Sequence, residues 1–174
     1  MQNINLGSGP HAIDGWLNFD VEQHRGVTKL DLSRGSLPLP TSSVMYAYSE
    51  HFVEHLKRDE ALTLFREVHR VLRINGVFRV STPDLRILLD DYFRDRTDRF
   101  KGVWEPRTAC QMVNEGMRLW GHQFVYDRPE LENLLYLAGF NRVYLAAWHE
   151  SDHPMLRRLE VRPYNQDLIL EAVK

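Results

Sequence analysis

Residues 4–10 read Ile4-Asn5-Leu6-Gly7-Ser8-Gly9-Pro10, a short apolar run that passes into a turn containing two glycines. The next apolar run, 16–21, carries an acidic residue, Asp20, near its end. Glycine lacks a Cβ, so the backbone of such a turn can take unusual dihedral angles and let a ligand approach closely. A carboxylate placed like Asp20 can accept hydrogen bonds from both hydroxyls of a ribose. Together the two features predict the start of a nucleotide-type cofactor site.

The composition is that of an ordinary globular protein. The chain has 174 residues, of which 43% are hydrophobic and 26% are charged, and its formal net charge is −2. This length predicts a single domain over residues 1–174, with a core large enough to need no disulfide or structural metal. The near-neutral charge argues against nucleic acid as a partner, because even the basic run at 94–101 is interleaved with aspartates.

Cysteine usage and hydropathy bear on location. Cys110 is the only cysteine, so no internal disulfide can form. No apolar run approaches the length of a membrane span, and residues 1–3 lead into a strand-like segment without a signal-type core. We therefore expect a cytoplasmic protein with no membrane span.

Short apolar runs alternate with helical patterns along the chain. A helical pattern occupies 59–72 before Asn75-Gly76, and a second one occupies 129–137 before Gly139. This alternation predicts an α/β, Rossmann-like doubly wound fold, with a mainly parallel seven-stranded sheet and helices on both faces. The seven expected strands are 3–6, 16–21, 27–30, 44–48, 76–81, 142–148 and 168–173.

Residues 84–121 are less regular than the rest of the chain. The stretch 85–93 has a helical pattern, and the part that follows mixes charged residues with tryptophan and methionine. We expect 84–121 to form a cap, inserted in the domain, that covers the substrate.

In an open parallel sheet, ligands bind beyond the carboxyl ends of the strands. The first four expected strands end in short polar segments, which should therefore meet at one edge of the sheet. These segments are Gly7-Ser8-Gly9, Asp20-Val21-Glu22, Asp31-Leu32 and Ser49-Glu50-His51.

The order and spacing of these segments resemble a class I S-adenosylmethionine-dependent methyltransferase, and more closely the short bacterial group of the type 11 methyltransferases. The resemblance continues through 81–84 and 122–140, so it covers most of the chain except the cap. The motifs that carry it are Leu6-Gly7-Ser8-Gly9-Pro10, Gly15-Trp16-Leu17-Asn18-Phe19-Asp20, Leu37-Pro38-Leu39-Pro40, Ser49-Glu50-His51-Phe52-Val53-Glu54-His55-Leu56 and Arg70-Val71-Leu72-Arg73-Ile74-Asn75-Gly76.

The resemblance implies a role for each strand end. The segment 7–9 would pass beneath the methionine part of S-adenosylmethionine, and Asp20 would hold the ribose hydroxyls. Asp31 and Leu32 would flank the adenine, and 49–51 would line the floor where methyl donor and acceptor meet. The cofactor-binding residues implied in this way are Leu6, Gly7, Ser8, Gly9, Asp20, Val21, Asp31, Leu32, Ser49 and Glu50.

The first crossover departs from the wider family pattern. Only 20 − 9 = 11 positions separate Gly9 from Asp20, too few for a full helix, and the third glycine of the loop is missing. Part of the usual support from a helix terminus is then lost. No helices precede the first expected strand either. We expect a shortened first crossover and an open cofactor site that a partner, such as a second copy in a homo-oligomer, could cover.

Methyl transfer from a sulfonium mainly requires in-line alignment, and a base is needed only for hydroxyl acceptors. His51, His55 and His122 are the candidate bases, because the pKa of histidine lies nearest neutrality, and His51 ranks first by position. The resemblance implies a small-molecule or glycan-type acceptor and favours O-methylation. The alternative is a catalytically silent methyltransferase-like binding or assembly module.

The segment His149-Glu150-Ser151-Asp152-His153 matches the two-histidine zinc protease pattern. That chemistry needs both histidines on one face of a helix, but the segment follows a β-type run and Pro154 disfavours helical dihedral angles at His153. We expect a surface loop here, and no metal site in the chain.

Overall fold

The computed structural model describes residues 2–162 and 167–174, which form one seven-stranded sheet in the order β3-β2-β1-β4-β5-β7-β6. Strands β1 to β5 pair in parallel, and β7 runs antiparallel to both β5 and β6. The predicted α/β, Rossmann-like fold with a mainly parallel seven-stranded sheet is confirmed. The long helices that cover the sheet lie on one face, whereas helices were expected on both. The strands are β1 Gln2–Leu6, β2 Leu17–Asp20, β3 Val27–Lys29, β4 Val44–Glu50, β5 Leu72–Thr82, β6 Arg142–Leu145 and β7 Leu168–Val173.

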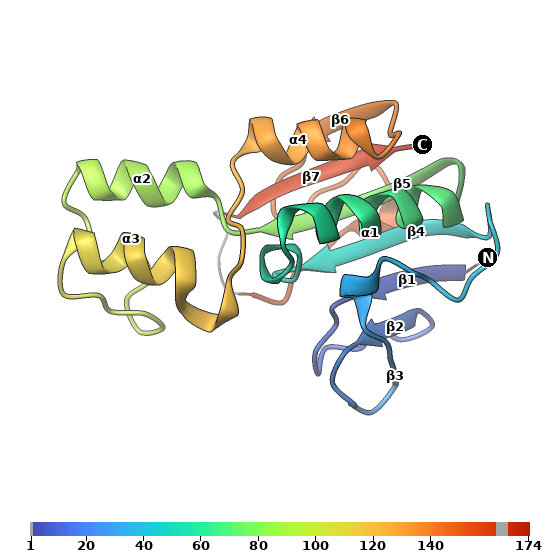
Figure 1. Ribbon diagram of the computed structural model, residues 1–174, viewed down its shortest axis with the longest axis horizontal. Coiled ribbons are helices and arrows are strands. Elements are labelled where there is room, and N and C mark those ends of the chain that lie inside the picture. Colours follow the sequence, from blue (N-terminus) through green and yellow to red (C-terminus); the bar gives the residue numbers. More distant parts are fainter. Residues whose placement is uncertain (1, 163–166) are drawn as a thin grey trace.

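Helices α1 (Arg58–Val71) and α4 (Arg128–Leu137) pack side by side on one face of the sheet (Figure 1). Buried apolar residues recur at three- and four-residue spacing along α1, so one stripe of the helix faces the sheet and the opposite side meets solvent. This stripe belongs to the larger of two hydrophobic clusters. Its members are Ala61, Leu64, Phe65, Val68 and Val71.

The second face of the sheet is covered mainly by loops and by the single-turn helix η4 (Pro154–Leu156), which contributes Leu156 to the smaller hydrophobic cluster. A fully buried arginine, Arg79 on β5, holds this covering segment. Its guanidinium donates to the carboxylates of Glu160 and Glu171, each at 2.6 Å. The zinc-protease-like segment 149–153 lies in this loop and is not helical, as predicted.

No helix joins β1 to β2, as the short spacing predicted. The buried side chain of Asn18 organises this crossover instead. Its amide nitrogen donates to the carbonyl oxygens of Ile13, Trp16 and Gly26, while its oxygen accepts from the backbone N–H of Ile13 and from the side chain of Asn5. A single asparagine therefore replaces part of the support that a crossover helix would give.

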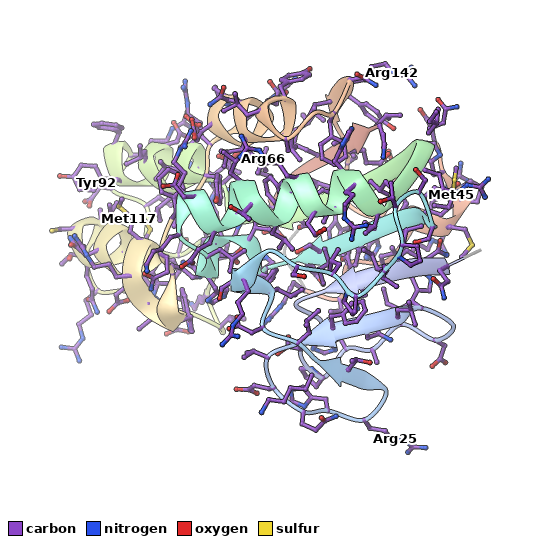
Figure 2. All side chains as sticks on the ribbon, turned by 45° about the vertical axis from the view of Figure 1, so that its right-hand side comes forward. Arg25, Met45, Arg66, Tyr92, Met117 and Arg142 are labelled. Carbon is purple, nitrogen blue, oxygen red and sulfur yellow. The ribbon has the colours of Figure 1, made fainter. Side chains whose placement is uncertain are left out.

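The cap contains α2 (Leu85–Phe93) and α3 (Ala109–Arg118), which lie beyond the carboxyl ends of the parallel strands (Figure 1). Close contact between them requires Gly116, because a Cβ there would lie 2.8 Å from Cδ2 of Leu88. Tyr92 and Met117 lie on the outer surface of the cap (Figure 2).

Strand β5 begins earlier than predicted. The expected end of the helical pattern, Asn75-Gly76, lies inside β5, where the pairing with β4 shifts register and Asn75 has a φ of 62°. The helix ends at Val71 and the chain continues directly into the strand. Within the described residues, no helix is both long and apolar enough to cross a membrane.

Candidate functional site

The carboxyl end of β4 turns sharply into the site. His51 follows the strand with a φ of 47°, and the single-turn helix η2 (Val53–His55) begins two residues later. This tight reversal directs Glu54 into the protein interior, where the residue is fully buried. Oε2 of Glu54 accepts a hydrogen bond of 3.0 Å from Oγ1 of Thr82 at the end of β5.

His51 lies between two carboxylates. Its Nε2 is 2.8 Å from Oδ2 of Asp167, and its Nδ1 is 3.4 Å from Oε1 of Glu54. Burial lowers the pKa of His51, but the hydrogen bonds and charges of the two carboxylates outweigh burial and raise this pKa to about 10. Burial raises the pKa of Glu54, and the interactions with His51 outweigh it, so this pKa is lowered. Both effects favour an imidazolium held between two carboxylates.

His55 and His122 form an edge-to-face pair with ring centroids 5.1 Å apart. Nδ1 of His122 is 2.9 Å from the carbonyl oxygen of Gly116, so this nitrogen carries the hydrogen and donates it. Burial lowers the pKa of His55, which favours the neutral ring, while a backbone hydrogen bond to Gly121 acts in the opposite direction.

The sheet and the cap are joined beside this pair. The backbone carbonyl of Glu54 accepts the N–H groups of Gln123, at 2.7 Å, and Phe124, at 3.1 Å. His122 precedes these two residues and follows the single-turn helix η3 (Leu119–Gly121). The loop that brings His122 to His55 is therefore anchored on η2 itself.

A cavity of about 310 Å³ lies between the carboxyl ends of β4 and β5 and the cap. All three histidines proposed as bases from the sequence line it, and so do three carboxylates and three aromatic residues of the cap. Burial raises the pKa of one of the carboxyls, that of Asp84. The carboxylates are Glu54, Asp84 and Asp167, and the aromatic residues are Phe100, Trp104 and Trp120.

The glycine turn after β1 has the unusual backbone dihedral angles that its two glycines predict. Gly7 and Gly9 have φ values of 67° and 49°. Phe52 packs so closely on Gly7 that a Cβ there would lie 2.1 Å from Cγ of the ring. The Asp20 carboxylate at the end of β2 accepts the N–H of Gly9 at 2.8 Å and that of Glu22 at 2.9 Å.

The remaining residues of the predicted cofactor set lie at the same edge in different settings. Asp31 caps the single-turn helix η1 (Leu32–Arg34), and its carboxylate accepts from Ser33 and Arg34. Glu50 accepts from the N–H groups of Val161 and Arg162. Leu6, Ser8, Leu32 and Ser49 are buried, while Val21 is exposed.

Sequence reasoning missed two residues of the site. Asp167, which holds His51, lies far along the chain beside β7, and no local pattern marks it. Thr82, which holds Glu54, lies in segment 81–84, which the sequence marks only through the family resemblance. A polar residue at the end of a predicted buried strand is the signal that could have found Thr82.

A family model described as a methyltransferase domain matches residues 7–80, the segment that contains the glycine turn, Asp20 and the β4–η2 turn. This match spans 74 of the 174 residues. The match and the fold confirm the predicted class I, type 11-like methyltransferase. The enzyme class is therefore methyltransferase, with S-adenosylmethionine as the cosubstrate.

Solved structures of methyltransferases share the fold across the whole chain. For each of three, the alignment covers 99% of this chain. The first is from Thermotoga maritima and is described as a SAM-dependent methyltransferase, possible histamine N-methyltransferase, with 17% identity, 82% of its own chain covered and a TM-score of 0.60. The second, a SAM-dependent methyltransferase from Archaeoglobus fulgidus, has 14% identity, 86% coverage and a TM-score of 0.62.

The third is the Burkholderia thailandensis 1,6-didemethyltoxoflavin-N1-methyltransferase, solved with 1,6-didemethyltoxoflavin and S-adenosylhomocysteine, at 15% identity, 70% coverage and a TM-score of 0.59. A comparison with curated proteins found no match to the sequence. At these identities the likeness establishes the fold of the chain.

Proposed function

We propose that this methyltransferase transfers the methyl group of S-adenosylmethionine to a hydroxyl of a small-molecule or glycan-type acceptor, in the cytoplasm. The observation that carries the proposal is the position of the cavity. Residues His51, Glu54 and His55 of the β4–η2 turn line it, and Phe52 of the same turn packs directly on Gly7 of the glycine turn. Donor and acceptor sites would therefore share one wall, as in-line transfer requires.

For the donor, we assign the glycine turn and Asp20 to the methionine and ribose parts of the cosubstrate. The Asp20 carboxylate already accepts two backbone N–H groups, one on each oxygen. A carboxylate has about four acceptor positions, so capacity remains for the ribose hydroxyls. Asp31 and Leu32 are assigned to the adenine, and Leu6, Val21, Ser49 and Glu50 to the surrounding wall and floor.

For the acceptor, the cavity combines flat apolar surfaces with hydrogen-bond acceptors. Trp104 and Trp120 lie edge to face with ring centroids 5.4 Å apart, and both line the cavity. Aromatic rings of this kind pack against the apolar face of a planar or cyclic ligand. The carboxylates of Glu54 and Asp84 can accept hydrogen bonds from ligand hydroxyls. A polyhydroxylated ring fits both properties.

Loss of the hydroxyl proton is assigned to the His55–His122 pair. Both ring nitrogens of His51, the base favoured by the sequence, face carboxylates. His51 therefore has a positioning role between Glu54 and Asp167. His55 and His122 each line the cavity and are held by backbone groups of the cap.

Calorimetric titration with S-adenosylmethionine and S-adenosylhomocysteine tests the donor site first. We expect saturable one-to-one binding, followed by methyl transfer from labelled cosubstrate to one member of a panel of sugars and phenols. Binding without transfer to any hydroxyl acceptor would contradict O-methylation. Absence of both binding and thermal stabilisation at millimolar ligand would favour the silent module or a site that a partner completes, and light scattering then tests the predicted homo-oligomer.

A further inference from the structure

We propose that Glu54, His55 and His122 bind one divalent transition-metal ion at the floor of the cavity. The ligand atoms that these three residues offer all lie within 4.8 Å of one another. Two atoms that each lie about 2.1 Å from one ion are at most about 4.2 Å apart, so small side-chain rotations bring the set into ligating range. Two imidazoles and one carboxylate, with open positions toward a cavity, suit zinc, iron or manganese.

The ligand side chains are already oriented by other groups. Nδ1 of His122 donates to the carbonyl of Gly116, which leaves the lone pair of Nε2 available. A ring nitrogen of His55 has a backbone hydrogen bond to Gly121 in the same way. Oε2 of Glu54 accepts from the hydroxyl of Thr82. Such contacts fix the tautomer and direction of metal ligands, and they are the usual surroundings of a metal site.

Charge supports a cation at this point. Glu54 and Asp167 are buried carboxylates, and His51 lies between them. Even with His51 fully protonated, this group of three carries a net charge of −1. In addition, Oε1 of Glu54 is fully buried, and its contact with Nδ1 of His51 is a long one, at 3.4 Å. A carboxylate oxygen has two lone pairs, so Oε1 keeps the capacity to bind a metal ion.

The chemical role of the ion rests on the proposed function. With the ion bound, the free ring nitrogens of His55 and His122 would be ligands and not bases, and the ion would take over their role. A hydroxyl bound to a metal loses its proton more easily, so the acceptor proton would pass to water. The acceptor oxygen then forms a bond to the methyl carbon, the carbon–sulfur bond breaks, and its electron pair returns to sulfur. The leaving product is S-adenosylhomocysteine, and atoms and charge balance without a further reagent.

The test uses the full chain, stripped with a chelator and titrated separately with Zn²⁺, Mn²⁺ and Mg²⁺, with elemental analysis after dialysis. We expect one Zn²⁺ or Mn²⁺ per chain, with weaker binding of Mg²⁺. His122→Gln and Glu54→Gln should each weaken this binding by at least about tenfold. His24→Gln is the matched control, because His24 also faces a carboxylate, that of Glu22 at 3.4 Å, but lies outside the cavity.

Three outcomes would overturn the site: no stoichiometric binding of Zn²⁺ or Mn²⁺, unchanged binding in both ligand variants, or equal loss in His24→Gln. Circular dichroism and melting curves identify a variant that has unfolded. His122 is only partly buried, so glutamine should be tolerated there. Cosubstrate binding is measured on the same samples. Metal binding without cosubstrate binding would refute the proposed function alone, while methyl transfer by metal-free protein would refute the role of the ion.

Discussion

The carboxylate of Asp20 accepts the backbone N–H of Gly9 at 2.8 Å, so the end of β2 holds the glycine turn that follows β1. The same carboxylate accepts the N–H of Glu22 on its other oxygen. Because the first crossover has no helix, Asp20 has two roles. It fixes the shape of the turn, and it presents acceptor oxygens at the place proposed for the ribose.

Asp20→Ala is expected to abolish binding of S-adenosylmethionine while the fold persists. The variant loses the acceptors for the ribose and releases the Gly9 N–H, which costs about 1–3 kcal/mol of unfolding free energy. Calorimetry and a denaturant titration measure the two effects. Glu22→Ala serves as the control, because its side chain makes no contact with the turn among the described interactions. Unchanged cosubstrate affinity in Asp20→Ala would remove Asp20 from the site.

Gly7→Ala should destabilise the protein by about 1–3 kcal/mol, because a Cβ at φ 67° is strained and would overlap the ring of Phe52. Gly15→Ala is a matched control, with a φ of 78° but no described atom within 4 Å of the added Cβ. Gly15→Ala should lower the free energy of unfolding only by the cost of the backbone strain. The double variant Gly7→Ala with Phe52→Ala should recover the part due to overlap. Equal melting temperatures for the Gly7 and Gly15 variants would contradict the close packing.

Arg79→Leu should lower the free energy of unfolding by about 3–5 kcal/mol, because it leaves the carboxylates of Glu160 and Glu171 buried without their partner. Urea titration at neutral pH measures the loss. Arg66→Leu, on the exposed side of α1, should change stability by less than about 0.5 kcal/mol. Figure 2 labels Arg66 there. A comparable effect of the two substitutions would show that the ion triad does not hold the second face.

His69 gives a pH dependence of stability. Burial and the charge of Lys174 lower the pKa of His69 in the folded protein, where the ring packs on Phe140. The unfolded chain then takes up the proton first, so this contribution to stability is fully present above the ordinary pKa of 6.5 and is lost as pH falls toward the folded value. Denaturant titrations between pH 5 and 8 should show a shallower decline for His69→Gln than for the unaltered protein. An identical decline would contradict the shift.

The strands and the main helices could be predicted because each is a local pattern. The apolar spacing along α1 and the short apolar runs depend only on neighbouring residues. The segment Asn75-Gly76 has the composition of a helix end but lies in a strand irregularity, because a turn-forming pair is typical of both. Only pairing with β4 distinguishes the two.

The site was predictable in part for the same reason. His51 and His55 are close in sequence and lie at a strand end, so position alone suggested them. His122 was also among the predicted bases, but its contact with His55 could not be inferred, and neither could Asp167, because both reach the site from distant segments. The loops that cover the second face of the sheet could not be predicted either, because they depend on the ion pairs of Arg79 with Glu160 and Glu171.

The segment that follows the cap is attached to the sheet at one point, where the backbone carbonyl of Glu54 accepts the N–H groups of Gln123 and Phe124. Two of the proposed metal ligands lie on the sheet side of this attachment, and His122 lies on the cap side. A bound ion would therefore link Glu54 and His55 to His122, and so fix the cap against the ends of the strands. Metal content and cap movement would then be coupled, and slower amide exchange in 109–124 on metal addition would be its signature.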